Sequence, residues 1–276
     1  MDSYVERPPV PALAGVVRTV WIQRTGATAY VQRHLPTGGV EIHFPIGGRP
    51  QLVGPLTGPA IEVIPPHTTI VGVRFQPGTA PPVPAVLDDL VDQRLSLAEL
   101  WGRSADRLVE AMARAATPER ALGDLQAHLL REFRGAAHVD PLVRAAVRAL
   151  MPWRPVSVDA VADHLALSAS QLRRRCLHAL GMTPKVLQRT LRFQGFLALA
   201  QAGAKASGAA GLAADVGYAD QAHLSRECLR LTGLTPTALL GGAVDHCACG
   251  HEHSASYAPF LATRARFVQD GPDRRS

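Results

Sequence analysis

The fold of the second half of the chain is decided by AVADHLALSASQLRRRCLHALGMTPKVL (160–187), which returns 52 residues later as LAADVGYADQAHLSRECLRLTGLTPTAL (212–239). Ten of the 28 aligned positions are identical without a gap. The identities include cysteine, glycine, threonine and proline as well as alanine and leucine, so they do not reflect composition alone. Self-similarity at a fixed spacing indicates one supersecondary unit present twice.

Each copy reads as two helices joined by a tight turn, followed by the start of a third helix. In the first copy Ser157 and Ser168 stand at helix N-caps, Gly181 ends the second helix, and Thr183 with Pro184 begins the next. In the second copy Gly217 ends the first helix, Asp220 caps the second, Gly233 ends the second, and Thr235 with Pro236 begins the next. Both copies therefore predict a helix-turn-helix unit.

The second helix of each unit has an apolar face and a polar face. The residues expected to face inward are Leu172, Cys176 and Leu180 in the first unit and Leu224, Cys228 and Leu231 in the second. The outward residues are Ser170, Arg173 and Arg174 in the first unit and Gln221, Ser225 and Arg226 in the second. Such a helix is typical of insertion into a DNA major groove.

The outward residue types suit the reading of base pairs. Arginine pairs bidentately with guanine, glutamine pairs with adenine, and hydroxyl groups bond to either a base or a phosphate. Helix starts at Thr183 and Thr235, with Lys185 beside the first, offer backbone N–H groups and positive charge to phosphate oxygens. A duplicated unit that binds protein instead of DNA is the alternative that the pattern leaves open.

The positive charge of the chain is concentrated in this duplicated segment. Residues 139–241 hold 12 basic and 6 acidic side chains, whereas basic and acidic residues balance before and after it, so the segment carries the whole net charge of +6. A positive excess on one domain is expected of a polyanion-binding protein.

The stretch YADQAHLSRECLRLTGLTPTALL resembles the signature of AraC/XylS-type transcription regulators. The matching residues are Gly217, Tyr218, Asp220, Gln221, His223, Arg226, Gly233 and Pro236. The resemblance implies a fold of seven helices over residues 139–241, in which a long helix from 184 to about 202 joins two helix-turn-helix units. It also implies that the two recognition helices enter successive major-groove segments of double-stranded DNA.

Carried over position by position, the resemblance assigns DNA contact to Ser170, Arg173 and Arg174, and to Gln221, His223, Ser225 and Arg226. A place at the edge of the core is the alternative for His223. The chain departs from the family at Cys176 and Cys228, where phenylalanine is usual. We interpret this paired change as a packing difference in preference to a redox sensor.

The first 80 residues predict strands. The runs 16–22, 29–35, 40–46, 60–64 and 70–75 are rich in β-branched and aromatic residues and are separated by glycine and proline, which favours a sandwich or a partial barrel. Helical periodicity follows from Val86, so we expect an α+β domain over 1–134. This half resembles the β-rich N-terminal domain of actinobacterial regulators, which implies a small-molecule effector or a homodimer.

The C-terminal segment, 242–276, contains a cluster of metal-ligand residues. Cys247, Cys249, His251 and His253 alternate along the chain, so an extended backbone places them on one side, where they suit Zn²⁺. A flexible tail with incidental metal affinity is the alternative. A cupin-like metal site in the first half is an alternative suggested by His34, His43 and His67. These histidines form no ligand motif, so we interpret them as ordinary strand or loop residues.

The leading hypothesis is a sequence-specific transcription regulator. We expect it to be cytoplasmic, because the chain begins without a signal peptide and lacks a membrane-length apolar run. The resemblance also suggests RNA polymerase as a partner. A metal-responsive regulator acting through the C-terminal cluster is the alternative. An enzyme of the DNA-alkylation-repair type fits the sequence poorly, since the reactive cysteine of such an enzyme needs a folded module of its own. We expect no resident cofactor other than zinc.

Overall fold

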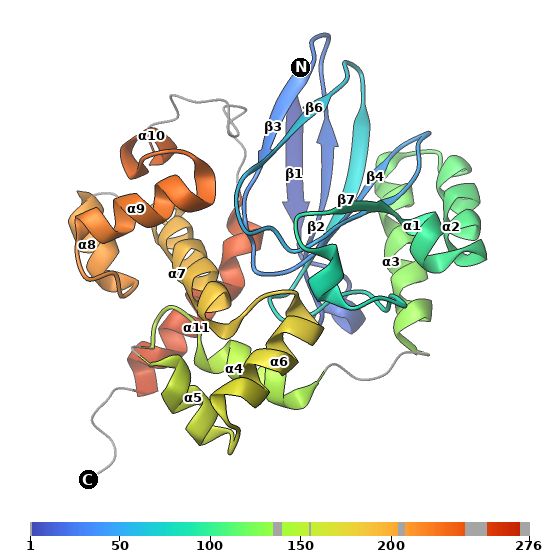
Figure 1. Ribbon diagram of the computed structural model, residues 1–276. Helices are drawn as coiled ribbons and strands as arrows, with labels where there is room; N and C mark the ends of the chain where they lie inside the picture. The colour runs from blue at the N-terminus through green and yellow to red at the C-terminus, as the bar shows by residue number, and fades with distance from the viewer. Residues whose placement is uncertain (1, 135–139, 155, 204–207, 241–252, 271–276) are drawn as a thin grey trace.

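The computed structural model describes residues 2–134, 140–154, 156–203, 208–240 and 253–270, which form a β-rich half followed by a helical half (Figure 1). The strands are β1 (Ser3–Arg7), β2 (Val17–Arg24), β3 (Tyr30–His34), β4 (Glu41–Pro45), β5 (Gln51–Val53), β6 (Ala60–Ile64), β7 (Thr69–Phe75) and β8 (Arg94–Ser96). The predicted fold class, a β-rich N-terminal region followed by helices, is confirmed.

Six of these strands form one antiparallel sheet in the order β1-β2-β7-β4-β5-β8, and β3 pairs with β6 in a separate two-stranded sheet. Side chains alternate between the two faces of β2. Val20 and Ile22 enter the main core, whereas Trp21 packs with Ile64 in a small cluster toward β6. Gly72 of β7 leaves the space for the Trp21 ring, because a Cβ there would lie 2.1 Å from it.

Three helices and two 3-10 turns complete the β-rich half. They are η1 (Pro11–Leu13), η2 (Leu87–Leu90), α1 (Leu97–Trp101), α2 (Arg103–Ala113) and α3 (Pro118–Arg134). Helix α3 lies against β2 and β7, where its fully buried Leu125 and Leu129 meet Val73 and Phe75 in one core. Burial of such side chains contributes about 1.5–3 kcal/mol each.

The helical half surrounds one long central helix. Its elements are α4 (Pro141–Ala149), α5 (Val158–His164), α6 (Ala169–Leu180), α7 (Pro184–Gln201), α8 (Gly208–Asp215), α9 (Gln221–Thr232) and α10 (Pro236–Leu240). Twelve residues of α7 are buried, because α6, α8 and α9 pack around it. The long connecting helix that the resemblance implied is therefore present.

A further helix, α11 (Ser254–Asp270), lies in the C-terminal segment, for which the sequence predicted no helix. It packs against α7 and also against β1 and β2, so it connects the two halves (Figure 1). Phe260 is buried in the helical core, and the Trp153 indole donates a 2.9 Å hydrogen bond to its carbonyl. Among the described residues, no helix combines the length and the apolar character needed to span a bilayer.

Candidate nucleic-acid interface

The first repeat folds as two capped helices. The Ser157 hydroxyl accepts from the Ala160 N–H at the start of α5, and Ser168 forms a capping box with Gln171 at the start of α6. Gly181 ends α6 with a φ of 66°, a conformation that glycine adopts without the cost of a Cβ. These caps are the ones predicted from the sequence, so the turn between α5 and α6 is locally encoded.

The second repeat follows the same plan. Asp220 caps α9 by accepting from the His223 N–H at 2.5 Å, and Gly233 ends the helix with a φ of 73°. Arg189 of α7 donates to both oxygens of Glu227 on α9, at 2.6 and 2.8 Å. This bidentate pair fixes the second unit against the central helix.

The inward positions of both second helices are closed to solvent. Leu172, Cys176, Leu224 and Cys228 each have 0% exposure. Burial raises the pKa of the Cys176 thiol to about 11 and that of the Cys228 thiol to about 12. Because the thiolate is the reactive form, these cysteines are inert side chains, which supports the packing interpretation of the departure from phenylalanine.

The outward positions differ between the two units. Ser170, Arg173 and Arg174 are exposed on α6, and Gln221 and Arg226 are exposed on α9. All five side chains are open to solvent.

Ser225 and His223 of α9 are half-buried instead. The Ser225 hydroxyl donates to the Gln221 carbonyl at 2.9 Å, and the His223 ring meets the Tyr218 ring edge-on at 5.1 Å. His223 thus occupies the core-edge position that the sequence left open, while its role toward DNA stays a prediction.

The predicted phosphate contacts lie at helix starts. Thr183 and Thr235 cap α7 and α10 with their hydroxyls, which accept from Val186 and Ala238 N–H groups at 3.3 and 3.2 Å. Lys185 is exposed in the first turn of α7. Since the hydroxyls act as caps, a phosphate would meet the backbone N–H groups of these turns and the Lys185 ammonium.

The first recognition helix packs against the β-rich half, a contact that sequence reasoning missed. Helix α6 lies beside η2, and Val86 and Asp88 line a shallow cavity of about 390 Å³ together with Ser170, Arg173 and Arg174. The approach is closest at Gly181, where a Cβ would lie 2.5 Å from the Leu87 carbonyl oxygen. The arginines of α6 are therefore solvent-exposed but have a neighbour from the other half.

Replacing Gly181 by alanine is expected to destabilise the protein more than the same change at Gly233. Both glycines have a positive φ, so each substitution costs about 1–2 kcal/mol. Among the described residues, a Cβ at 233 would meet only Arg33 at 3.5 Å. A Cβ at 181 would collide with the Leu87 backbone, which adds about 1–3 kcal/mol. Urea unfolding of the two variants measures the difference, and equal losses would show that α6 does not approach η2.

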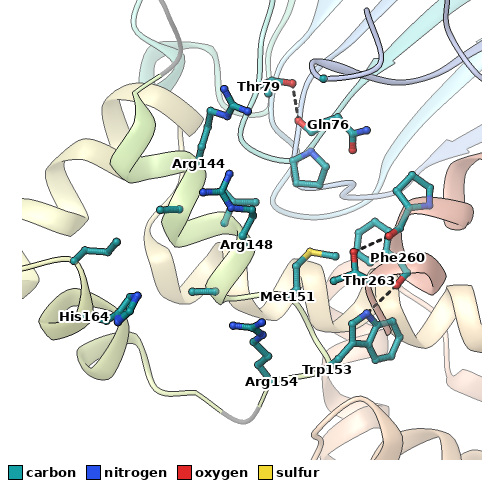
Figure 2. A pocket seen from close by; sticks show the side chains of 17 residues that line it. Gln76, Thr79, Arg144, Arg148, Met151, Trp153, Arg154, His164, Phe260 and Thr263 are labelled. Atoms are coloured by element: carbon teal, nitrogen blue, oxygen red, sulfur yellow. Dashed lines mark hydrogen bonds between the residues drawn. The ribbon is translucent and has the colours of Figure 1, made fainter. Parts of the chain in front are cut away.

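An open cavity of about 570 Å³ lies where the two halves meet (Figure 2). Gln76 and Thr79 line it from the β-rich half, and Met151, Trp153 and Phe260 supply apolar surface from the helical half. Arg144, Arg148 and Arg154 lie on the helical side, and no acidic residue is among the described residues that line it. The cavity thus combines an apolar wall with positive charge.

A buried ionic network crosses the junction between β1, β2, β4, β7 and α11. Arg74 donates to Glu6 at 2.8 Å and to Glu41 at 2.7 Å. Burial alone would raise the pKa of both carboxyl groups. The Arg74 guanidinium, together with His253 and Ser256 at Glu6 and His43 at Glu41, outweighs burial and holds each pKa well below its usual range. The Ser256 N–H donates to Glu6 at 3.0 Å, so α11 is part of the same network.

Arg18 lies beside this network with 3% exposure. Its guanidinium donates to Gln194 of α7 at 3.1 Å and to the Ser256 carbonyl, and it stacks over the Phe260 ring at 4.7 Å. Burial lowers the pKa of Arg18 to about 10. These contacts bind the β-rich half to both α7 and α11.

The C-terminal cluster falls largely outside the described residues. Cys247, Cys249 and His251 lie in the segment 241–252, which the structure does not describe. His253 precedes α11, and its Nδ1 lies 3.0 Å from Glu6. Zinc binding by the cluster therefore stays a prediction, with His253 already engaged by a buried carboxylate through one ring nitrogen.

Comparison with known proteins assigns both halves to described domain types. Residues 161–241 match the family profile "Helix-turn-helix domain", and residues 5–96 match "Domain of unknown function (DUF6597)". The duplicated helical unit is thus part of a recognised helix-turn-helix domain. No curated protein matches the sequence.

Among solved structures, ToxT from Vibrio cholerae is similar. One ToxT structure at 1.65 Å resolution shares 10% identity, covers 80% of this chain and 97% of its own, and has a TM-score of 0.47. A ToxT structure described as bound to an unsaturated fatty acid shares 10% identity, covers 87% and 94%, and has a TM-score of 0.41.

Proposed function

We propose that the chain is a DNA-binding transcriptional regulator of the AraC type, in which α6 and α9 of the helix-turn-helix domain read successive major-groove segments of one operator. The observation that carries this proposal is the duplication itself. Two units with matching caps and matching buried positions present exposed Arg174 and Arg226 at equivalent places, 52 residues apart. A protein that places an arginine at the same position of two units suits double-stranded DNA, whose major groove recurs with each helical turn.

The duplex sequence that the protein prefers tests the proposal. Selection from a random pool of duplexes with the full chain should enrich one site with two separately conserved base clusters, one for each unit. The affinity for that site should fall linearly on a logarithmic scale as salt rises, because bound counterions are released. Enrichment of a single cluster would contradict reading by both units.

We extend the proposal to control by a small molecule in the 570 Å³ cavity between the two halves. Its volume falls within the range typical of ligand sites. Its apolar wall and its arginines favour an organic acid with an apolar body. Because the cavity contacts Thr79 on one side and Arg148 of α4 on the other, an occupant would act on both halves at once.

The contact between η2 and α6 supplies a route from such a ligand to DNA. A duplex that reaches Ser170, Arg173 and Arg174 would enter the cavity that Val86 and Asp88 also line, so it would come close to the β-rich half. A ligand that changes how the β-rich half packs on the helices would therefore change access to the outward residues of α6. The β-rich half meets α9 at its C-terminal end instead, where Arg33 donates to the Thr232 carbonyl at 3.0 Å. The proposal thus predicts that effector binding alters contacts at one half-site more than at the other.

A panel of aliphatic and aromatic carboxylic acids tests the cavity. An acid that occupies it at 100 times Kd should stabilise the protein by about 2.7 kcal/mol and raise Tm by several degrees. Arg148→Ala should remove this shift. Arg114→Ala, which deletes an exposed arginine that caps the C-terminal end of α2 outside the cavity lining, should keep it. Equal shifts in both variants would show that the acid binds elsewhere.

Homodimerisation and contact with RNA polymerase are expectations of the family resemblance and belong to this proposal. The metal-responsive alternative through Cys247 and Cys249 has no support in the described residues, of which only His253 belongs to the cluster.

A further inference from the structure

Three strands of the β-rich half bring His34, His43 and Glu62 to one point. One ring nitrogen of each histidine and one carboxylate oxygen of Glu62 all lie within 4.8 Å of one another. His34 is on β3 and Glu62 is diagonally across on β6, since His34 pairs with Ala60 in the register of that sheet. His43 comes from β4 of the other sheet, and the two imidazole rings lie 5.1 Å apart.

We propose that His34, His43 and Glu62 bind a divalent transition-metal ion such as Zn²⁺. Two imidazoles and one carboxylate form a donor set that suits borderline divalent ions and leaves at least one coordination position open. A tetrahedral zinc site places its donors about 3.3–3.5 Å apart, so side-chain movements of about 1 Å would close the set. This site is distinct from the cysteine and histidine cluster near the C-terminus.

The environment of His43 supports the assignment. Its side chain is 2% exposed, its Nε2 lies 3.3 Å from Glu41 Oε2, and its Nδ1 has no hydrogen-bond partner in the described part of the chain. A buried ring nitrogen without a partner is costly in a folded protein. Histidines that bind metals usually hold their second ring nitrogen against a carboxylate, as His43 does with Glu41.

The carboxylate partners are themselves fixed. Arg74 holds Glu41 at 2.7 Å, and Arg94 donates to both oxygens of Glu62 at 2.9 and 2.6 Å. His34 Nε2 lies 2.7 Å from Glu62, an interaction in which a metal ion would replace the shared proton. Outer hydrogen bonds of this kind orient metal ligands.

The site has a path to solvent. The side chains of His34 and Glu62 are 15% and 27% exposed, and His34 also lines a cavity of about 330 Å³ between the β-rich half, α7 and α11. Of the three donors, His34 is the one that lines this second cavity. Arg94 makes the site less favourable for a cation, because its positive charge neutralises Glu62.

Titration of the full chain with Co²⁺, a spectroscopic substitute for Zn²⁺, tests the proposal. A background carrying Cys247→Ser, Cys249→Ser and His251→Gln removes three of the four donors of the C-terminal cluster and keeps only His253, whose Nδ1 lies 3.0 Å from Glu6. In this background we expect one Co²⁺ per chain, with visible absorption but no thiolate charge-transfer band. His34→Gln and Glu62→Gln should each weaken binding at least tenfold, whereas His67→Gln, an exposed histidine outside the cluster, should leave it unchanged.

The variant Arg94→Gln distinguishes two interpretations of His34, His43 and Glu62, namely a metal site and a cluster of ion pairs that only stabilises the fold. Loss of its charge should tighten Co²⁺ binding severalfold, whereas a cluster that only stabilises the fold would show a lower Tm and no change in Co²⁺ affinity. Tm measured without metal identifies any variant that fails to fold. Absence of Co²⁺ binding in the background, or wild-type affinity in folded His34→Gln and Glu62→Gln, would overturn the proposal.

Discussion

Replacing Arg174 and Arg226 together by alanine is expected to weaken binding at the selected operator by about 2–6 kcal/mol. Each arginine that reads a guanine contributes about 1–3 kcal/mol, and the two lie in separate helical units, so their losses should add. Each single variant should also relax the base preference at its own half-site. Fluorescence anisotropy with the operator and with point-mutated operators measures both effects.

The matched control is a double variant that removes the same charge elsewhere. Arg107→Ala with Arg114→Ala deletes an exposed arginine of α2 and the exposed arginine that caps the C-terminal end of this helix in the β-rich half. This control should bind the operator within about twofold of wild type, because rim charges distant from the duplex are largely screened. Wild-type affinity and wild-type base preference in the Arg174/Arg226 variant would show that the recognition positions have been assigned wrongly.

Replacing Arg74 by methionine is expected to destabilise the fold by about 3–5 kcal/mol at pH 7. The change keeps an unbranched stem of about the same width but removes the guanidinium, so Glu6 and Glu41 stay buried without their cation, and breaking a buried pair from one side costs this much. Urea unfolding followed by tryptophan fluorescence measures the loss. Arg24→Met breaks the exposed pair with Glu119 and should cost less than about 1 kcal/mol.

The pH dependence follows from the same network. Both carboxyl groups have a folded pKa below the unfolded value, so their contribution is present above about pH 4.3 and is lost as pH falls through the folded pKa. Without Arg74, burial favours the protonated carboxyls. The stability difference between wild type and Arg74→Met should therefore shrink as the pH falls from 7 to 4, and a constant difference would contradict the network.

The local features of the helical half were predictable because they depend on neighbours in the chain. N-caps such as Ser168 and Asp220 bond to backbone groups three residues away, and Gly181 and Gly233 stop their helices through their own φ. The buried positions of α6 and α9 follow from helical periodicity. Sequence alone therefore defined the duplicated unit and its outward side chains.

Three strands of the β-rich half were missed for a physical reason. The strand β1 contains only one strongly apolar residue besides its tyrosine, and its Glu6 is buried only because Arg74 of β7 and α11 meet it. The strands β5 and β8 have three residues each, too few to establish a period. Their structure is set by pairing with longer neighbours, not by local preference.

The sequence by itself determined the duplicated helix-turn-helix domain, its caps, its buried cysteines and its exposed arginines, because these depend on contacts within a few residues or on one repeating pattern. Only the tertiary structure decided that η2 lies against α6, that α11 joins the two halves through Glu6, and that His34, His43 and Glu62 meet. Glu6 and Ser256 are 250 positions apart. His34 and His43 are close in the sequence but lie on strands of different sheets. Their encounter depends on strand order and packing, which no local spacing encodes.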